Sequence, residues 1–361
     1  MLCILVQQPL DFPLPFATFG GTGASILGRL SGRGGELNKI LRARSVRPGD
    51  GAAIANMMQK VTPLHTELLD RLPRVLDQLA EEEAVIGTVV ESIFGNGREP
   101  KIVGSTVLAF VSDKIADNYD STPFPALSSS LLQMVGKTDT GPFLNRREQA
   151  DGNTGTGMQQ VILEFAVDPM DIRHADFGGI MNELYSAHFQ FERGYNVKSV
   201  FVEANAALET LITGTGMRPK KKFDLAGSNE NITIPASIGT QRGYYKVGRE
   251  EMPDLPPSCA AAIIMTYMPP TFRFSPTEQR LLKRSVEGKT DEQIAESLGI
   301  SRDAVKQTWR AIYDHVTDIM PEILQDEADV SSGRGAEKRR HIVAHVRNNL
   351  QELKPHYLRR G

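Results

Sequence analysis

The sequence is poor in cysteine and tryptophan and has no apolar run long enough to cross a bilayer. Its two cysteines, Cys3 and Cys259, have no partner nearby in the sequence, so we expect no disulfide framework and a reducing, cytoplasmic setting. The longest later apolar run, Cys259 to Met268, is too short for a membrane helix and predicts a buried strand. The opening residues lack a basic segment and a long apolar core, so we expect no signal peptide.

A large net charge and internal repeats are also missing. The formal net charge is −3, with 40% apolar and 24% charged residues, which is typical of globular domains and unlike a chain that binds polyanions all along its length. A length of 361 residues predicts two or three domains.

The first segment, residues 1–45, is rich in glycine and arginine and is expected to be a flexible lead-in. Its glycine-rich stretch, residues 19–35, lacks the Lys-Ser/Thr ending of a phosphate-binding loop. Near the other end of the chain, His341 and His345 have the spacing of two ligands on one helix face, but no third ligand accompanies them. We therefore predict no cofactor and no metal.

Residues 46–268 alternate helix and strand patterns and predict an α/β domain with a mixed, largely antiparallel sheet. Helices are expected over 47–60, 63–82, 177–191 and 206–214. Strands are expected over 84–94, 101–111, 159–167, 197–203, 220–225, 243–247 and 260–268. Pro73 should kink or break the second helix, and Asn96-Gly97 should turn the first two strands into a hairpin. The polar stretch 118–157 is expected to be a long loop or an insertion.

After Pro269-Pro270, three short helices are predicted by their caps. Ser275 and Glu278 form a capping-box pattern with Pro276 between them. Thr290 should begin the second helix, Gly299 should make the turn, and Ser301 should begin the third. The inner side of the third helix would be formed by Val305, Trp309 and Ile312.

This region, residues 271–320, resembles the LuxR/FixJ-type helix-turn-helix family. The matching motifs are Ser275-Pro276-Thr277-Glu278, Gly288-Lys289-Thr290, Gln293-Ile294-Ala295, Leu298-Gly299-Ile300-Ser301 and Val305-Lys306. Ala304, Thr308 and Trp309 depart from the family pattern, which puts any family consensus site in doubt. A three-helix module that binds protein is the alternative interpretation.

The resemblance implies that the third helix enters the DNA major groove. Lys306 and Gln307 would then be the candidates for contacts to base edges. Lys289, Thr290 and Arg310 would contact phosphates, and Arg302 lies on the same outer face.

Residues 321–361 form a predicted tail with an amphipathic helix over 337–353. Such a helix favours packing or dimerisation, so a homodimer is expected.

The middle region is similar to the GNAT acetyltransferase superfamily in its order of elements. Val167-Asp168-Pro169 closes a strand, and Arg173 and Gly178 are in register with the family's pyrophosphate loop. However, Asp176 stands where a glycine is usual, and its carboxylate would repel an anion. Asn205 and Gly216 are in place, but Ile212 replaces the tyrosine that is the usual general acid. The resemblance therefore implies a degenerate GNAT-like domain, and an unrelated α/β sensor fold stays open.

Together the two resemblances predict a cytoplasmic transcription regulator that is not an enzyme. Its partners would be double-stranded DNA, an unknown small-molecule effector and a second copy of the chain, with no membrane. The α/β domain would sense the effector or mediate assembly. The alternative is an active GNAT acetyltransferase joined to a DNA-binding domain.

Overall fold

The computed structural model describes residues 39–94, 98–171, 173–227, 231–324 and 334–356. Its centre is a seven-stranded sheet in the order β1-β3-β4-β5-β6-β9-β7. All neighbouring strands are antiparallel except β5 and β6, which are parallel, so the predicted mixed, largely antiparallel sheet is confirmed. The strands of this sheet are β1 (Lys39–Ser45), β3 (Val85–Phe94), β4 (Lys101–Val111), β5 (Met158–Val167), β6 (Val197–Asn205), β7 (Arg218–Asp224) and β9 (Gln241–Gly248).

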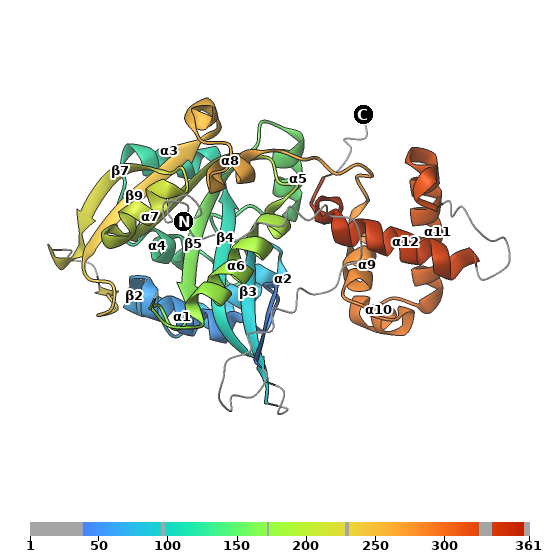
Figure 1. Ribbon diagram of the computed structural model, residues 1–361, viewed down its shortest axis with the longest axis horizontal. Coiled ribbons are helices and arrows are strands. Elements are labelled where there is room, and N and C mark those ends of the chain that lie inside the picture. Colours follow the sequence, from blue (N-terminus) through green and yellow to red (C-terminus); the bar gives the residue numbers. More distant parts are fainter. Residues whose placement is uncertain (1–38, 95–97, 172, 228–230, 325–333, 357–361) are drawn as a thin grey trace, which may run out of the picture.

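Helices cover both faces of this sheet, and Figure 1 shows α6 crossing in front of β4 and β5. One face packs against the helices α1 (Gly51–Val61), α2 (Leu72–Glu81), α3 (Asp113–Ser121) and α4 (Leu127–Gln133). The other face packs against α6 (Phe177–Glu192) and α8 (Ala260–Met265). The short helices α5 (Arg146–Thr154) and α7 (Glu209–Gly214) and the two-stranded sheet of β2 (Leu64–His65) and β8 (Ile232–Thr233) complete this part.

Strand β1 lies in a segment that was expected to be irregular. Leu41 and Ala43 pack into the core under α6, whereas Arg42 and Arg44 alternate with them and both bind Glu91 of β3. This period-two pattern is typical of a strand, but the glycine-rich residues before it obscured it. The remainder of the predicted lead-in lies outside the described residues.

Two other predictions of local structure are wrong. The stretch 118–157 is not a long loop, since it contains α4, α5 and the end of α3. Helix α5 begins at a capping box in which Asn145 and Glu148 bind each other's backbone N–H groups. Residues 260–268 do not form a strand, because the Ala-rich run Ala260–Met265 is the helix α8. A short apolar run cannot by periodicity alone be assigned to a strand or to a buried helix.

Pro73 has the predicted effect on the segment 63–82. It occupies the first turn of α2, so the helix begins at Leu72 instead of running through. The predicted hairpin of β3 and β4 is present, although its Asn96-Gly97 turn lies outside the described residues.

The C-terminal helices form a second body with its own core, beside the sheet (Figure 1). They are α9 (Pro276–Val286), α10 (Asp291–Leu298), α11 (Arg302–Ile319) and α12 (Arg334–Asn348). Ser275, Thr290 and Ser301 cap the first three, and Gly299 adopts the left-handed conformation at the end of α10, as the sequence predicts. Trp309 lies in this core and stacks on Tyr313.

The two bodies meet at a polar junction. Lys283 of α9 pairs with Glu83 at 2.8 Å, and Arg146 of α5 binds both Glu83 and Gln279 of α9. Lys354 donates a hydrogen bond to the carbonyl oxygen of Phe191 in the last turn of α6. The helical body is therefore fixed to the sheet body near the carboxyl end of α6.

In the described part of the chain, no helix is both long enough and apolar enough to cross a membrane.

Candidate active site

The two parallel strands at the middle of the sheet diverge. β5 and β6 pair only from Met158 to Ile162, opposite Val197 to Val202. Beyond these residues, β5 stays paired with β4 and β6 stays paired with β9. The sheet therefore opens in its interior, and the facing edges of β5 and β6 are available to a ligand.

A β-bulge lies at the point where the strands separate. Ile162 is opposite Leu108 of β4, and Glu164 is opposite Val107, so Leu163 is an extra residue in β5. A bulge bends its strand and redirects the side chains beside it. Here it places Leu163 and Glu164 consecutively on the face that α1 covers, since both contact groups on that side.

A cavity of about 610 Å³ occupies this opening. Its walls come from both faces of the sheet, because Met57 of α1 and Leu184 of α6 both line it. Most other lining side chains are apolar, among them Val202, Ile212 and Met217. A cavity of this size and lining is typical of a binding site for a small organic molecule.

Glu164 is the buried carboxyl group of this cavity. It is only 2% exposed, and its Oε2 accepts a hydrogen bond of 2.9 Å from the hydroxyl of Ser105. Its Oε1 has no hydrogen-bond partner among the described residues. Burial raises the pKa of Glu164 to about 8, against the smaller opposing effect of the Ser105 hydrogen bond. A carboxyl group with this pKa can exchange protons near neutral pH.

Arg242 and Glu203 form a buried ion pair in the same cavity wall. Their side chains are 4% and 2% exposed, and Nε of Arg242 lies 3.1 Å from Oε1 of Glu203. Glu203 also accepts a hydrogen bond of 2.9 Å from the backbone N–H of Leu127, at the start of α4. Burial raises the pKa of Glu203 and lowers that of Arg242.

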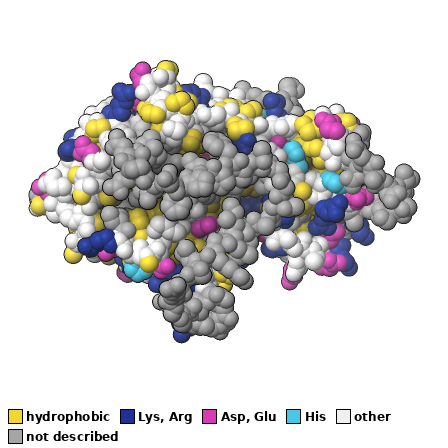
Figure 2. Space-filling view, viewed as in Figure 1, with side chains coloured by type: hydrophobic (Ala, Val, Ile, Leu, Met, Phe, Trp, Pro, Cys, Tyr) yellow, Lys and Arg dark blue, Asp and Glu magenta, His cyan; other side chains and the backbone are white. Residues whose placement is uncertain are grey.

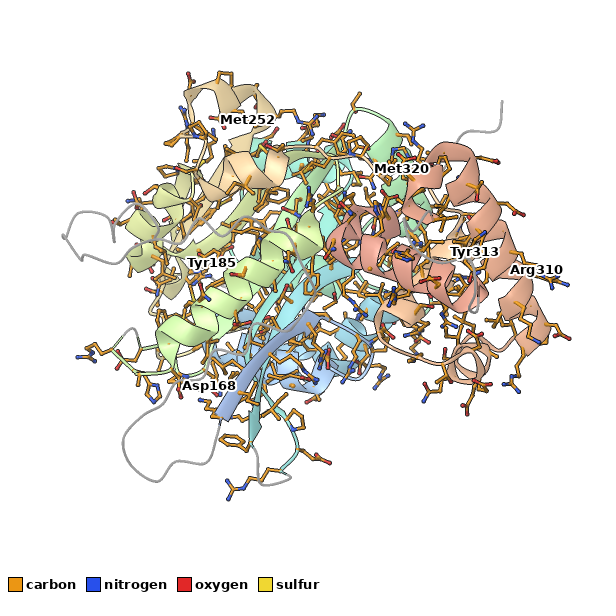
Figure 3. All side chains as sticks on the ribbon, turned by 45° about the vertical axis from the view of Figure 1, so that its right-hand side comes forward. Asp168, Tyr185, Met252, Arg310, Tyr313 and Met320 are labelled. Carbon is orange, nitrogen blue, oxygen red and sulfur yellow. The ribbon has the colours of Figure 1, made fainter. Side chains whose placement is uncertain are left out.

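On the opposite face, α6 brings His188 to the cavity. Its Nδ1 lies 3.4 Å from Oε1 of Glu192, one helical turn later, and Gln160 of β5 donates a hydrogen bond to Oε2 of Glu192. Figure 3 shows Tyr185 on the same helix, and Asp168 lower in this view. The cavity therefore has ionisable groups on both of its faces.

Some residues of the GNAT-like motifs line this cavity, and others lie in the segment before α6. Asp168 lines it and pairs with Lys60 at 3.0 Å. Asp176 occupies the N-cap position of α6 and binds Lys39, while Arg173 is paired with Asp171 at 3.0 Å. Carboxylates thus gather before α6, where a nucleotide pyrophosphate would need free N–H groups and cations.

Asn205 and Ile212 are also found where the motif predicts. Asn205 caps the turn after β6 and lines the cavity, and Ile212 lines it from α7. Gly216 adopts φ +99, and a Cβ there would come within 2.9 Å of Cys259 Sγ, so only glycine fits well.

The residues predicted to contact DNA lie in the helical body, away from the cavity. Lys306, Gln307 and Arg310 are exposed on α11, and Figure 3 shows Arg310 at the outer side of that body. Thr290 is the cap of α10, with Lys289 beside it.

Acidic groups lie among these cations. Arg302 pairs with Glu292, and Lys306 lies 3.6 Å from Asp303. Figure 2 shows basic and acidic side chains interspersed over the described surface of this body. The DNA contacts assigned to Lys289, Thr290, Arg302, Lys306, Gln307 and Arg310 stay a prediction from the sequence.

Comparison with known proteins gives matches only among solved structures. No model of a known protein family matches the chain. No curated protein matches it either. FeeM, an N-acyl amino acid synthase from uncultured soil microbes, is 9% identical, with 60% of this chain and 92% of that chain covered at a TM-score of 0.32.

Two further matches are acetyltransferases. A chimera that includes spermidine N-acetyltransferase from Vibrio cholerae is 10% identical, covering 58% of this chain and 97% of its own at a TM-score of 0.31. The ribosomal L7/L12 α-N-protein acetyltransferase RimL is 7% identical to this chain. The match covers 58% of this chain and 93% of RimL, at a TM-score of 0.27.

These matches contradict the prediction of a DNA-binding transcription regulator that is not an enzyme. The three structures named above are an N-acyl amino acid synthase and two acetyltransferases, and none of them is a transcription regulator. At such identities the likeness concerns the fold, so the activity has to be argued from the site itself.

The inference against catalysis had rested on Asp176 and Ile212, and it overlooked Glu164. The sequence did contain a signal for it, since Glu164 is the only charged residue in the apolar run Val161–Val167. A charged residue within a buried strand requires an explanation. The bulge that places it at the strand opening depends on pairing with β4, which the local sequence does not reveal.

Proposed function

We propose that the protein transfers an acyl group from a thioester to an amine in the cavity between β5 and β6. The observation that carries this proposal is the position of a buried carboxyl group, Glu164, at the point where the two strands separate and the cavity begins. The donor would enter from the α6 side and the acceptor from the α1 side.

The unpaired edge of β5 suits a donor that carries the acyl group on a pantetheine arm. Such an arm contains amide groups, which can pair with exposed strand N–H and C=O groups as an added strand does. The bulge at Leu163 would leave the thioester beside Glu164. The apolar lining favours an acyl chain of several carbons over acetyl, because burying each additional methylene contributes about 0.8 kcal/mol.

The acidic side chains in the segment before α6 suggest that the nucleotide part of a coenzyme A donor contributes little to binding. Asp168, Asp171 and Asp176 lie there, and the cations that pair with them, Lys60 and Arg173 among them, are already neutralised. A pyrophosphate would meet like charge at this position. The pantetheine arm and the acyl chain would supply most of the recognition.

In the reaction, Glu164 acts as the general base. The acceptor nitrogen forms a bond to the thioester carbonyl carbon, the carbon–sulfur bond breaks, and the nitrogen loses a proton to Glu164 Oε1. The sulfur leaves and becomes a thiol by taking up a proton. Because its pKa is raised to about 8, Glu164 is a stronger base than an ordinary carboxylate.

The test is an assay with the purified full chain and the coenzyme A thioesters of acetate, octanoate, dodecanoate and hexadecanoate. Thiol release is followed with and without amines, and the products are identified by mass spectrometry. We expect amine-dependent thiol release with one amide formed per thiol, and faster transfer of the longer chains. Absence of amide with every donor and amine would contradict the proposal.

A further inference from the structure

The guanidinium group of Arg242 has a free position. Its Nε and Nη2 both donate to Glu203, to Oε1 at 3.1 Å and to the backbone oxygen at 3.5 Å. Its Nη1 has no hydrogen-bond partner among the described residues, although the side chain is only 4% exposed. A buried donor without a partner is costly, which makes an acceptor atom at Nη1 favourable.

Glu203 cannot provide that acceptor atom by turning. Its Oε2 is held by the N–H of Leu127 at 2.9 Å, and its Oε1 already receives the Nε bond of Arg242. The arginine is therefore fixed in orientation by a carboxylate that is itself fixed to α4. An arginine held in this way is preorganised for an anionic oxygen, and carboxylates match its geometry.

Arg242 and Glu164 lie on the same side of the sheet. Ser105, which binds Glu164, also contacts Met57 of α1, and the Arg242–Glu203 pair is attached to α4. Helices α1 and α4 pack on one face of the sheet, and both Arg242 and Glu164 line the cavity. On the acceptor side of the cavity, Oε1 of the base Glu164 and Nη1 of the cation Arg242 thus both have no hydrogen-bond partner among the described residues.

We propose that Arg242 binds a carboxylate of the acceptor, so that the acceptor is an amino acid whose amine is deprotonated by Glu164. The inference rests on the proposed acyl transfer and names the substrate class for the same site. Both orphaned groups are then satisfied by one ligand, because an α-amino acid carries its amino group and its carboxylate on the same carbon atom. A simple amine would leave the N–H of Arg242 Nη1 buried and unpaired.

The test compares acceptors that differ only in the carboxylate. The full chain is given dodecanoyl coenzyme A with phenylalanine, phenylalaninamide or phenethylamine, and then with leucine, leucinamide or 3-methylbutylamine. We expect the amino acids to have kcat/KM about 10–100-fold above their amides and amines, the factor for one hydrogen bond to a charged group. Equal rates for amines without a carboxylate would overturn the inference while leaving acyl transfer intact.

Variants separate binding from stability. In R242Q the ratio of kcat/KM for phenylalanine to kcat/KM for phenethylamine should fall to about one, and in R242K this ratio should be intermediate. R249Q is the matched control, because Arg249 also has an orphaned buried nitrogen but lies outside the cavity lining. An R242Q protein that folds and keeps the full preference would refute the role of Arg242. If R242Q does not fold, the wild-type acceptor series decides alone.

A third result concerns the proposed function itself. If no acceptor is acylated and no amine-dependent thiol is released, acyl transfer fails, and the carboxylate site fails with it. If phenethylamine is acylated slowly and phenylalanine is acylated no faster, only the proposed carboxylate site is refuted.

Discussion

The strand opening and the C-terminal helical body satisfy their polar groups in different ways. In the helical body, the ends of α9, α10 and α11 are closed by the side chains of Ser275, Thr290 and Ser301. Among the described residues, both regions also have buried side-chain atoms without a hydrogen-bond partner. In the helical body these are on Trp309, His345 and Gln351, whereas at the opening they are on the carboxyl group of Glu164 and the guanidinium group of Arg242. An unsatisfied buried carboxyl or guanidinium group is costlier than an unsatisfied uncharged group, so such groups are expected at sites that bind a ligand.

The difference shows that a recognisable motif and the chemical site need not coincide. The helical body has the clearer sequence motif, because caps and turns are encoded within a few residues. The opening has no comparable motif, since its residues come from β5, β6, β9 and α6. The comparison predicts that changes at the opening alter catalysis, and that changes in the helical body alter stability alone.

The largest effect is expected from E164Q. Removing a general base typically lowers kcat by 10²-fold or more, so we expect a loss of about 100-fold for dodecanoyl transfer. The wild-type rate should rise with pH through about 8, the pKa of Glu164, and the residual rate of E164Q should not follow that profile. E183Q on α6 is the control, because Glu183 does not line the cavity. A rate of E164Q within threefold of the wild type would remove Glu164 from the mechanism.

The same substitution should stabilise the protein. Because the folded-state pKa of Glu164 is about 8 and its ordinary value is 4.5, the folded protein binds the extra proton between these pH values. Wild-type stability is therefore lost as the pH rises from 4.5 towards 8. Thermal unfolding should show E164Q melting higher than the wild type by about 3 °C at pH 8, with the difference shrinking at pH 5. A lower Tm at pH 8 would contradict the burial of this carboxyl group.

The next effect concerns the length of the acyl chain. Ala204 of β6 lines the cavity, so A204F should fill part of it and lower dodecanoyl transfer about tenfold while acetyl transfer changes little. A207F is the matched control, since Ala207 is exposed and outside the cavity lining. Equal losses for both chain lengths would mean that the acyl chain is bound elsewhere.

Local patterns sufficed to predict the framework that carries the site. Strands β3, β4 and β5 and helix α6 begin and end within two residues of the prediction, because alternation and helical periodicity are properties of short segments. The separation of β5 from β6 could not be predicted from local patterns, because it depends on the Leu163 bulge and on pairing partners that are distant in the sequence. Arg242 was missed for the same reason, because its partner Glu203 lies on another strand.

A smaller effect is expected at the junction of the two bodies. Burial opposes ionisation of Glu83, but Lys283 and Arg146 lower its pKa to about 2. This pairing stabilises the fold above pH 4.5 and is lost as the pH falls towards 2. At pH 7, E83Q should lower Tm by about 2–4 °C, a loss of about 1 kcal/mol, with acyl transfer within twofold of wild type. The neighbouring exposed Glu82 supplies the control E82Q. A large loss of transfer in E83Q alone would show that the junction also shapes the cavity.

The smallest effect is expected from T290A in the helical body. The hydroxyl of Thr290 accepts a hydrogen bond from the N–H of Gln293, so its removal should cost about 1 kcal/mol of stability without changing the rate of acyl transfer. T317A is the matched control, because the exposed hydroxyl of Thr317 only donates to the Tyr313 carbonyl within α11. Urea unfolding of the three proteins measures the difference. Thr290 is distant in the sequence from every residue that lines the cavity, and it lines no part of the cavity itself. A tenfold change in the rate of acyl transfer in T290A would therefore contradict the distinction between a region that reacts and a region that only folds.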